Sequence, residues 1–182
     1  MKRSLAVSLA ILGSGIALSS CSEQKSVEAA AYSNPDQCIA AGKFSREDCL
    51  SDYRTAVADF EKTAPAFKDK KDCEDEFGDG QCQTSAPTHP AGGGSFVPYM
   101  MGYMMGSNHS SSSPIAVAPQ ALYRSKSSSE FVNGSGIAVT KNLGSFTFKS
   151  RSSTFSAPSP STRTIARGGF GGRSSFGGSF GG

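Results

Sequence analysis

The chain has 182 residues, of which 37% are hydrophobic, and it contains 21 glycines, 9 prolines and no tryptophan. Its net charge of +3 hides two opposite parts: residues 21–90 carry 14 acidic and 8 basic side chains, whereas residues 91–182 carry 1 acidic and 8 basic ones. Gly and Ser make up 37 of the 92 residues in the second part, far above their usage in globular proteins. This composition excludes a single hydrophobic core that extends over the whole chain, and it predicts that only part of the chain folds.

The N-terminal residues are typical of an export signal. Lys2 and Arg3 precede an apolar run, residues 5–18, which as a helix would reach only about 21 Å, short of the ~30 Å of a bilayer core. The run therefore predicts a signal peptide over residues 1–20 and not a membrane-spanning helix.

The signal ends in a tetrapeptide, LSSC at residues 18–21, that resembles the bacterial lipobox. In such signals cleavage falls just before the cysteine, which is then acylated, and two acyl chains already anchor a protein stably. We therefore expect lipidation at Cys21, a tether over residues 21–33, and a location in the bacterial cell envelope. Ser22, in place of Asp, is typical of lipoproteins sorted to the outer membrane, facing the periplasm. An ordinary signal peptide is the alternative, and it leaves an odd cysteine in an exported protein.

Four further cysteines lie in the acidic part: Cys38, Cys49, Cys73 and Cys82. An even set in an exported segment predicts two disulfides. The spacings contain no Cys-x-x-Cys, which both zinc sites and redox-active pairs favour, so we expect no metal and no cofactor. Cys38–Cys49 with Cys73–Cys82 is the simplest pairing. On packed helices Cys73 would lie about 13 Å from Cys49, beyond the ~7 Å that a disulfide spans.

Helix signals follow one another through residues 34–83. Asn34 caps a first helix, Ser45 caps a longer second helix with an apolar face, and Asp69 precedes a short third. The acidic run over residues 69–79 lacks the EF-hand pattern and is expected to be a solvated helix face. The predicted fold class is a small all-α, disulfide-stapled module of three short helices, followed by a long, largely disordered Gly/Ser-rich tail.

After a Pro/Gly linker, residues 84–95, comes the most apolar stretch of the mature chain, residues 96–106. As a helix it would reach only ~16 Å, too short to cross a bilayer. Three interpretations stay open: a segment in the membrane interface, a contact for a partner in which methionine adapts to the surface, and an inert apolar patch. The candidate contact residues are Tyr99, Met100, Met101, Gly102, Tyr103, Met104, Met105 and Gly106.

Residues 107–182 are rich in Ser and Gly and sparsely apolar, so we expect a cationic tail that is mostly disordered. Phe146 and Phe148 predict at most a brief strand without a partner. RGGF at residues 167–170 and the later Phe-Gly-Gly units resemble nucleic-acid-binding segments, but export argues against a nucleic-acid partner. Anionic lipid, lipopolysaccharide and the acidic face of the module are the more suitable contacts, and a plain soluble linker is the alternative.

Two sequence blocks are specific, DCEDEFGDGQCQ at residues 72–83 and GYMMG at residues 102–106, and they follow Asp36-Gln37-Cys38 and Asp48-Cys49 in order. Together these blocks resemble the YgiB-like family of bacterial envelope proteins, over most of the mature chain. The resemblance implies a location and not a mechanism, because the family has no established activity. The chain departs from the family in its Ser/Phe-rich tail and in lacking a Trp before the methionine segment.

No motif of a common enzyme class occurs in the chain, and its histidines, His89 and His109, lie in loop-like sequence. We therefore expect a non-enzymatic protein: a lipid-anchored cell-envelope protein with a structural or interaction role. Its expected partners are the membrane, through the anchor, and an envelope protein or an anionic glycolipid. The alternatives are a thiol-redox factor or other enzyme that uses the cysteines, and an acidic module that binds a polyamine or cation.

Overall fold

The computed structural model describes residues 25–106, 117–150, 157–162 and 164–165, which form two β-sheets and three helices. The strands of the larger sheet are β1 (Lys25–Tyr32), β5 (Gly102–Gly106), β6 (Gln120–Arg124), β7 (Phe131–Val132), β8 (Ala138–Thr140) and β9 (Gly144–Ser150). Their order in space is β8-β7-β6-β5-β1-β9, and every neighbouring pair is antiparallel. β1 therefore has a partner on each edge, β5 on one side and β9 on the other.

The smaller sheet has four short strands. They are β2 (Ala66–Phe67), β3 (Cys82–Thr84), β4 (Phe96–Pro98) and β10 (Thr164–Ile165). Their order is β10-β2-β4-β3, with β10 parallel to β2 and the other pairs antiparallel. Among the described strands, β3 and β10 thus form the two outer edges of this sheet.

The three helices begin close to where the sequence places them: α1 (Pro35–Ala41), α2 (Arg46–Thr63) and α3 (Lys70–Phe77). The Asn34 side chain accepts a hydrogen bond from the Gln37 N–H (2.9 Å), and Ser45 Oγ accepts one from the Asp48 N–H (3.1 Å). Both bonds satisfy backbone donors that a helix start leaves open. None of the described helices combines the length and the apolar character needed to cross a bilayer.

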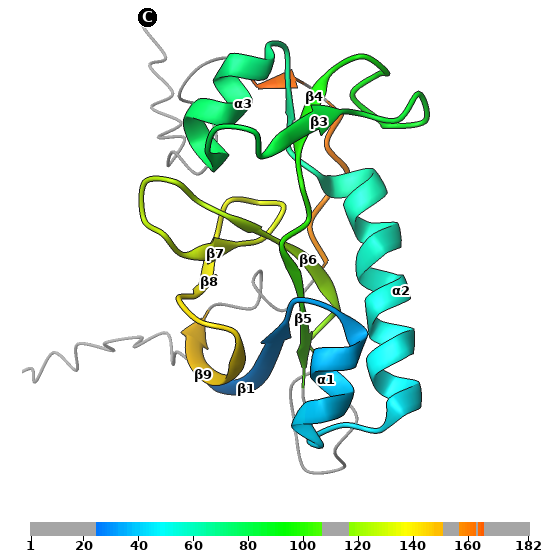
Figure 1. Cartoon of the computed structure of the whole chain (residues 1–182), viewed down its shortest axis with the longest axis vertical. Helices are drawn as coiled ribbons and strands as arrows, with labels where there is room; N and C mark the ends of the chain where they lie inside the picture. Colours follow the sequence, from blue (N-terminus) through cyan, green and yellow to red (C-terminus); the bar gives the residue numbers. More distant parts are fainter. Residues whose placement is uncertain (1–24, 107–116, 151–156, 163, 166–182) are drawn as a thin grey trace, which may run out of the picture.

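Helix α2 runs along one side of the molecule, with α1 beside its first turns and the β3–β4 hairpin beside its last turns (Figure 1). Buried side chains lie on both faces of the larger sheet. Met104 packs with Ala31 and Leu122 on one face, whereas Tyr103 and Met105 pack on the other, against α1 and α2. A third cluster joins the end of α2, the helix α3 and the smaller sheet.

The expected fold class was wrong. The protein is mostly β, and its three helices pack on strands and not only on one another. The tail expected to be largely disordered contributes β6 to β10, and residues 25–32, expected as part of a tether, form a strand with Ala29, Ala30 and Ala31 buried. Phe146 lies in β9, which has the partner that the sequence did not reveal, β1.

The continuous apolar pattern of residues 102–106 has a physical reason, because a strand covered on both faces needs no polar alternation. Its glycines serve close packing. A Cβ on Gly102 would lie 2.8 Å from the Tyr32 carbonyl oxygen, and one on Gly106 would lie 2.9 Å from the Val117 carbonyl oxygen. The GYMMG block is therefore a central strand between close neighbours.

Candidate functional site

All four cysteines in the described part of the chain form disulfides, Cys38–Cys49 and Cys73–Cys82, in the pairing that we expected. Their Cα–Cα distances are 5.8 Å and 6.2 Å. Every one of these cysteines is at most 4% exposed, and Cys38 Sγ also lies 3.4 Å from the Met105 sulfur. Such buried bridges are well placed to hold α1 to α2 and α3 to β3.

Most of the candidate contact residues are not at the surface. Tyr103, Met104 and Met105 are fully buried, as are Gly102 and Gly106 on either side of them. Only Tyr99 (43% exposed) and Met101 (40% exposed) project substantially to solvent, and Met100 is half-buried. In this structure the methionine segment is thus mainly core, and any outside contact is limited to its first residues.

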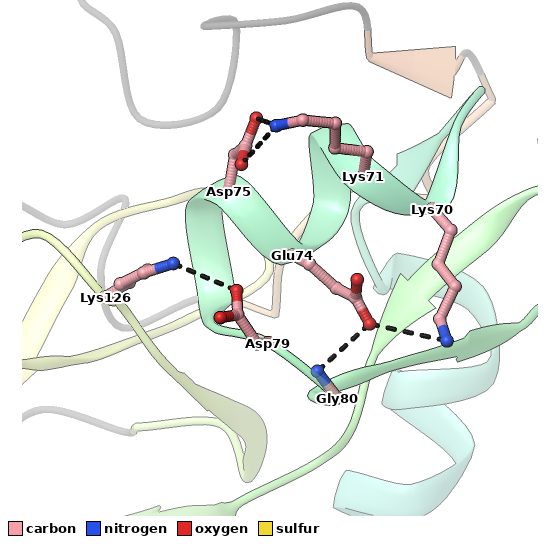
Figure 2. A network of polar contacts seen from close by, with 7 residues as sticks. All are labelled: Lys70, Lys71, Glu74, Asp75, Asp79, Gly80 and Lys126. Atoms are coloured by element: carbon pink, nitrogen blue, oxygen red, sulfur yellow. Dashed lines mark hydrogen bonds and ion pairs between the residues drawn. The ribbon is translucent and has the colours of Figure 1, made fainter.

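Three carboxylates of the acidic run, two on α3 and Asp79 just after it, make contacts within the chain (Figure 2). The Glu74 carboxylate accepts from the Gly80 N–H (3.0 Å) and lies 3.4 Å from Lys70 Nζ. Asp75 pairs with Lys71 (2.7 Å), and Asp79 with Lys126 (3.1 Å). Within the described residues no three metal-ligating side chains form a cluster.

Two expected sites lie outside the described residues. One is the lipidation site, Cys21, together with the signal peptide over residues 1–20. The other is the cationic end of the tail, residues 166–182, with its Arg-Gly-Gly-Phe and Phe-Gly-Gly units.

A pocket of about 310 Å³ opens between the second half of α2 and the β3–β4 hairpin. Its lining residues are Val57, Phe60, Glu61, Ala64, Gln83, Thr84, Ala86, His89 and Val97. This volume lies at the lower end for ligand-binding pockets, so it has room for one aromatic side chain and not for a large cofactor. We call it the α2–β3 pocket.

His89 forms part of the pocket wall, and it was missed at the level of sequence because nothing in its spacing distinguishes it from a loop residue. It is 5% exposed, and both ring nitrogens have partners. The Ala91 N–H donates to Nδ1 (3.2 Å), so the ring proton sits on Nε2 and donates to the Ala64 carbonyl (3.1 Å). Burial lowers the pKa of His89, although the Ala64 carbonyl opposes this shift. The ring is therefore a neutral structural link between the β3–β4 loop and α2.

On another face of α2, the half-buried Asp59 accepts a hydrogen bond from the Ala121 N–H (3.3 Å) of β6. Desolvation by burial raises the pKa of Asp59. Nearby, the buried Tyr123 hydroxyl has no hydrogen-bond partner among the described residues, and burial together with the Asp59 charge raises the pKa of Tyr123. The Tyr123 ring packs against Phe60 and Phe77, with centroid distances of 6.2 Å and 6.0 Å. This tyrosine is thus a neutral core residue.

The edge of β3 beside the pocket offers backbone groups. The Tyr99 N–H bonds to the Gln81 carbonyl (2.8 Å), and the Ser85 N–H bonds to the Ser95 carbonyl (2.7 Å). Since bonding directions alternate along an antiparallel pair, the N–H and C=O of Thr84 point away from β4. An exposed strand edge of this kind is suited to pairing with an added extended segment.

These features define a class: a mostly β protein with three helices, held by two buried disulfides and carrying a pocket next to a strand edge. A family described as proteins of unknown function, DUF1190, matches residues 26–181. The chain belongs to this family. The resemblance that the two specific sequence blocks indicated is thereby confirmed.

Several relatives of the chain carry the name UPF0441 protein. One from Pectobacterium carotovorum is 37% identical over 163 residues, covering 82% of this chain and 72% of its own. One from Photorhabdus laumondii is 36% identical over 190 residues, with coverages of 90% and 79%. One from Erwinia tasmaniensis is 36% identical over 179 residues, with coverages of 90% and 78%. No solved structure matches the chain.

Proposed function

We propose that the protein is an exported lipoprotein, anchored through Cys21 in the bacterial cell envelope, that acts there by binding another molecule and not by catalysis. The observation that carries the proposal is the pair of buried disulfides, each closing a short loop. Disulfides form and persist in oxidising compartments, among them the bacterial periplasm. The lipobox-like LSSC sequence supplies the expected anchor point.

The binding role is supported by the α2–β3 pocket and the edge of β3. The pocket has apolar walls from Val57, Phe60 and Val97, and a carboxylate, Glu61, stands among its lining residues. The histidine in its wall has both nitrogens engaged, which suits a rigid surface better than proton transfer. Shape, apolar contact, the negative charge of Glu61 and backbone pairing are therefore the means of recognition that this site offers.

The anchor is tested by the intact mass of the protein purified from membranes, before and after reduction and thiol alkylation. We expect a mature N-terminus at Cys21 with acyl chains, and no thiol that reacts without a reductant. Cys21→Ser is expected to lose the acyl mass and the membrane association, whereas the neighbouring Ser22→Ala keeps both. An unacylated wild-type protein with reactive thiols would overturn the proposal and favour the thiol-redox alternative.

The binding role is tested separately, by cross-linking in intact cells. A partner that uses the pocket is expected to be captured by the wild type and lost with Val57→Glu, which places a charge in the apolar wall. Ala58→Glu is the matched control, because this neighbouring side chain is exposed and does not line the pocket. Identical cross-links from both variants would contradict a binding role for this pocket.

A further inference from the structure

We propose that the C-terminal segment of the chain, residues 166–182, docks in the α2–β3 pocket of the same molecule, with a phenylalanine ring in the pocket and an arginine at Glu61. The inference needs neither the lipid anchor nor an outside partner. It makes the tail the resident occupant of the pocket, which a polypeptide from another protein would have to displace.

The pocket offers an apolar interior and one acidic group. Val57, Phe60 and Val97 line it, and its volume of about 310 Å³ accommodates one aromatic side chain. Glu61 is exposed, and among the described residues no cation pairs with it. An occupant that combines an aromatic ring with a positive charge is therefore complementary to this site.

The segment 166–182 has this combination. Its aromatic residues are Phe170, Phe176 and Phe180, its cations are Arg167 and Arg173, and it contains no acidic residue. Glycines surround the phenylalanines, so the backbone can approach another strand closely. The opposite charge of the two parts of the chain, with the acidic excess in residues 21–90, favours such a contact.

The described chain ends close enough for this contact. Ile165, the last described residue, packs on the same cluster as Phe60 of the pocket. In the same stretch, the Ser161 N–H donates to the carbonyl of Lys62, the residue after Glu61 (2.9 Å). Because Ile165 follows Ser161 by four residues, it lies at most about 14 Å of extended chain from this contact with the end of α2.

The length of the segment is sufficient for the path. β10 and β3 are the two outer strands of the smaller sheet, three strand spacings apart, which is about 14 Å. Phe170 follows Ile165 by five residues, so an extended chain can place it up to about 17 Å from Ile165. By the same measure Phe176 can lie up to about 36 Å from Ile165. Either ring can thus reach the pocket.

Backbone groups complete the site. The N–H and C=O of Thr84 point away from β4, along the outer edge of β3. An extended segment whose phenylalanine enters the pocket would pass this edge and could pair with it, as in the recognition of peptides by strand addition. The pocket and the edge thereby select an extended polypeptide and not a compact ligand.

The proposal is tested in the full-length mature protein by photo-cross-linking. A benzoylphenylalanine is introduced in place of Gln83, a half-buried residue of the pocket lining, and the cross-linked peptides are identified by mass spectrometry. We expect a cross-link to a peptide from residues 168–182 in a species of monomer mass. The same probe in place of the exposed Thr55, outside the pocket lining, is the control and is expected to give no such link.

Other occupants would be recognised by other products. A cross-linked species of dimer mass would assign the pocket to a second copy of the chain, and a link to another protein would assign it to that partner. Cross-links from position 83 to the pocket walls alone would show that the tail does not reach the site. Each of these outcomes overturns the proposal, and none depends on whether Cys21 is lipidated.

A second measurement uses the natural trypsin sites at Arg167 and Arg173 in the folded, full-length protein. Glu61→Lys replaces attraction by repulsion, so cleavage at these arginines is expected to become about two- to fivefold faster, the size of one exposed ion pair. Glu47→Lys, at an exposed acid near the other end of α2, is the matched control and is expected to leave the rates unchanged. Equal rates in the wild type and both variants would contradict docking at Glu61.

Discussion

His89 shows how a single buried side chain links pH to stability. Its neutral ring accepts from the Ala91 N–H and donates to the Ala64 carbonyl, thereby tying the β3–β4 loop to the end of α2. Protonation of Nδ1 would remove the acceptor for Ala91, and burial already disfavours the charged ring. The native state therefore binds this proton less readily than the unfolded chain.

The pKa of His89 in the folded protein lies below its ordinary value of 6.5, so its contribution to stability is full above pH 6.5. That contribution is expected to be lost as the pH falls from 6.5 through the folded value. Urea denaturation at several pH values measures this effect. The comparison with His89→Gln isolates it, since Gln can still donate and accept but does not titrate. A difference between the two proteins that is independent of pH would contradict the assignment.

For Asp59 we expect the opposite dependence of stability on pH. Burial raises its folded pKa above the ordinary 3.8, so its contribution to stability is full below pH 3.8 and is lost as the pH rises through the folded value. Asp59→Asn keeps an acceptor for the Ala121 N–H without a charge. Relative to the wild type, this variant is therefore expected to be more stable at pH 7 than at pH 4. Denaturation curves at both values check this, with the exposed Glu47→Gln as control. A relative stability that falls with rising pH would exclude the prediction.

At the scale of elements, the methionine segment is the most informative part. An uninterrupted apolar run of this length is compatible with a membrane contact, a partner contact or a buried strand, and local pattern does not separate these cases. The tertiary structure shows that the segment is a buried strand, because β5 lies between β1 and β6 and both of its faces are covered. The same residues that could attract a lipid surface are used as core.

This difference predicts unequal effects of two neighbouring methionines. Met104 is fully buried, whereas Met101 is 40% exposed. Met104→Ala is expected to lower the free energy of unfolding by about 2–5 kcal/mol, the usual loss for a large core side chain. Met101→Ala is expected to change it by less than about 0.5 kcal/mol. Chemical denaturation of both variants measures the contrast, and similar losses for the two would be inconsistent with β5 as a core strand.

At the scale of the whole molecule, the helices depend on strands that are distant in sequence. Cys38 and Cys49 share a cluster with Tyr103 and Met105 of β5, and Phe77 of α3 packs on Tyr123 of β6. A chain of residues 34–83 with both disulfides would expose these surfaces to water. The disulfides restrict such a chain, but they do not replace the missing contacts.

We therefore expect residues 34–83, oxidised, to show no cooperative unfolding transition, whereas residues 25–165 show one. Thermal denaturation followed by circular dichroism distinguishes the two cases. The fragment 25–165 serves as the control, because it contains every described strand and helix. A cooperative transition in the short fragment would mean that the helices form an independent module after all.

The sequence by itself determined the features that depend on near neighbours. Asn34 and Ser45 cap their helices as expected, because a cap needs only a side chain and an N–H three residues away. The disulfide partners were also predictable, since each pair is separated by only 11 or 9 positions. The two specific blocks were enough to indicate the family.

Only the tertiary structure decided which weak segments became strands. Residues 25–32 were expected to be a tether, and residues 144–150 indicated at most a brief strand without a partner, yet the two segments pair along almost their whole length. The α2–β3 pocket likewise combines α2 with the β3–β4 hairpin and its loop residue His89, two parts of the chain that α3 separates in sequence. The physical reason is that a strand gains its hydrogen bonds and its covered faces from partners elsewhere in the chain. Local pattern records whether a segment is able to pair, but the partner that makes it a strand is fixed only when the chain is folded.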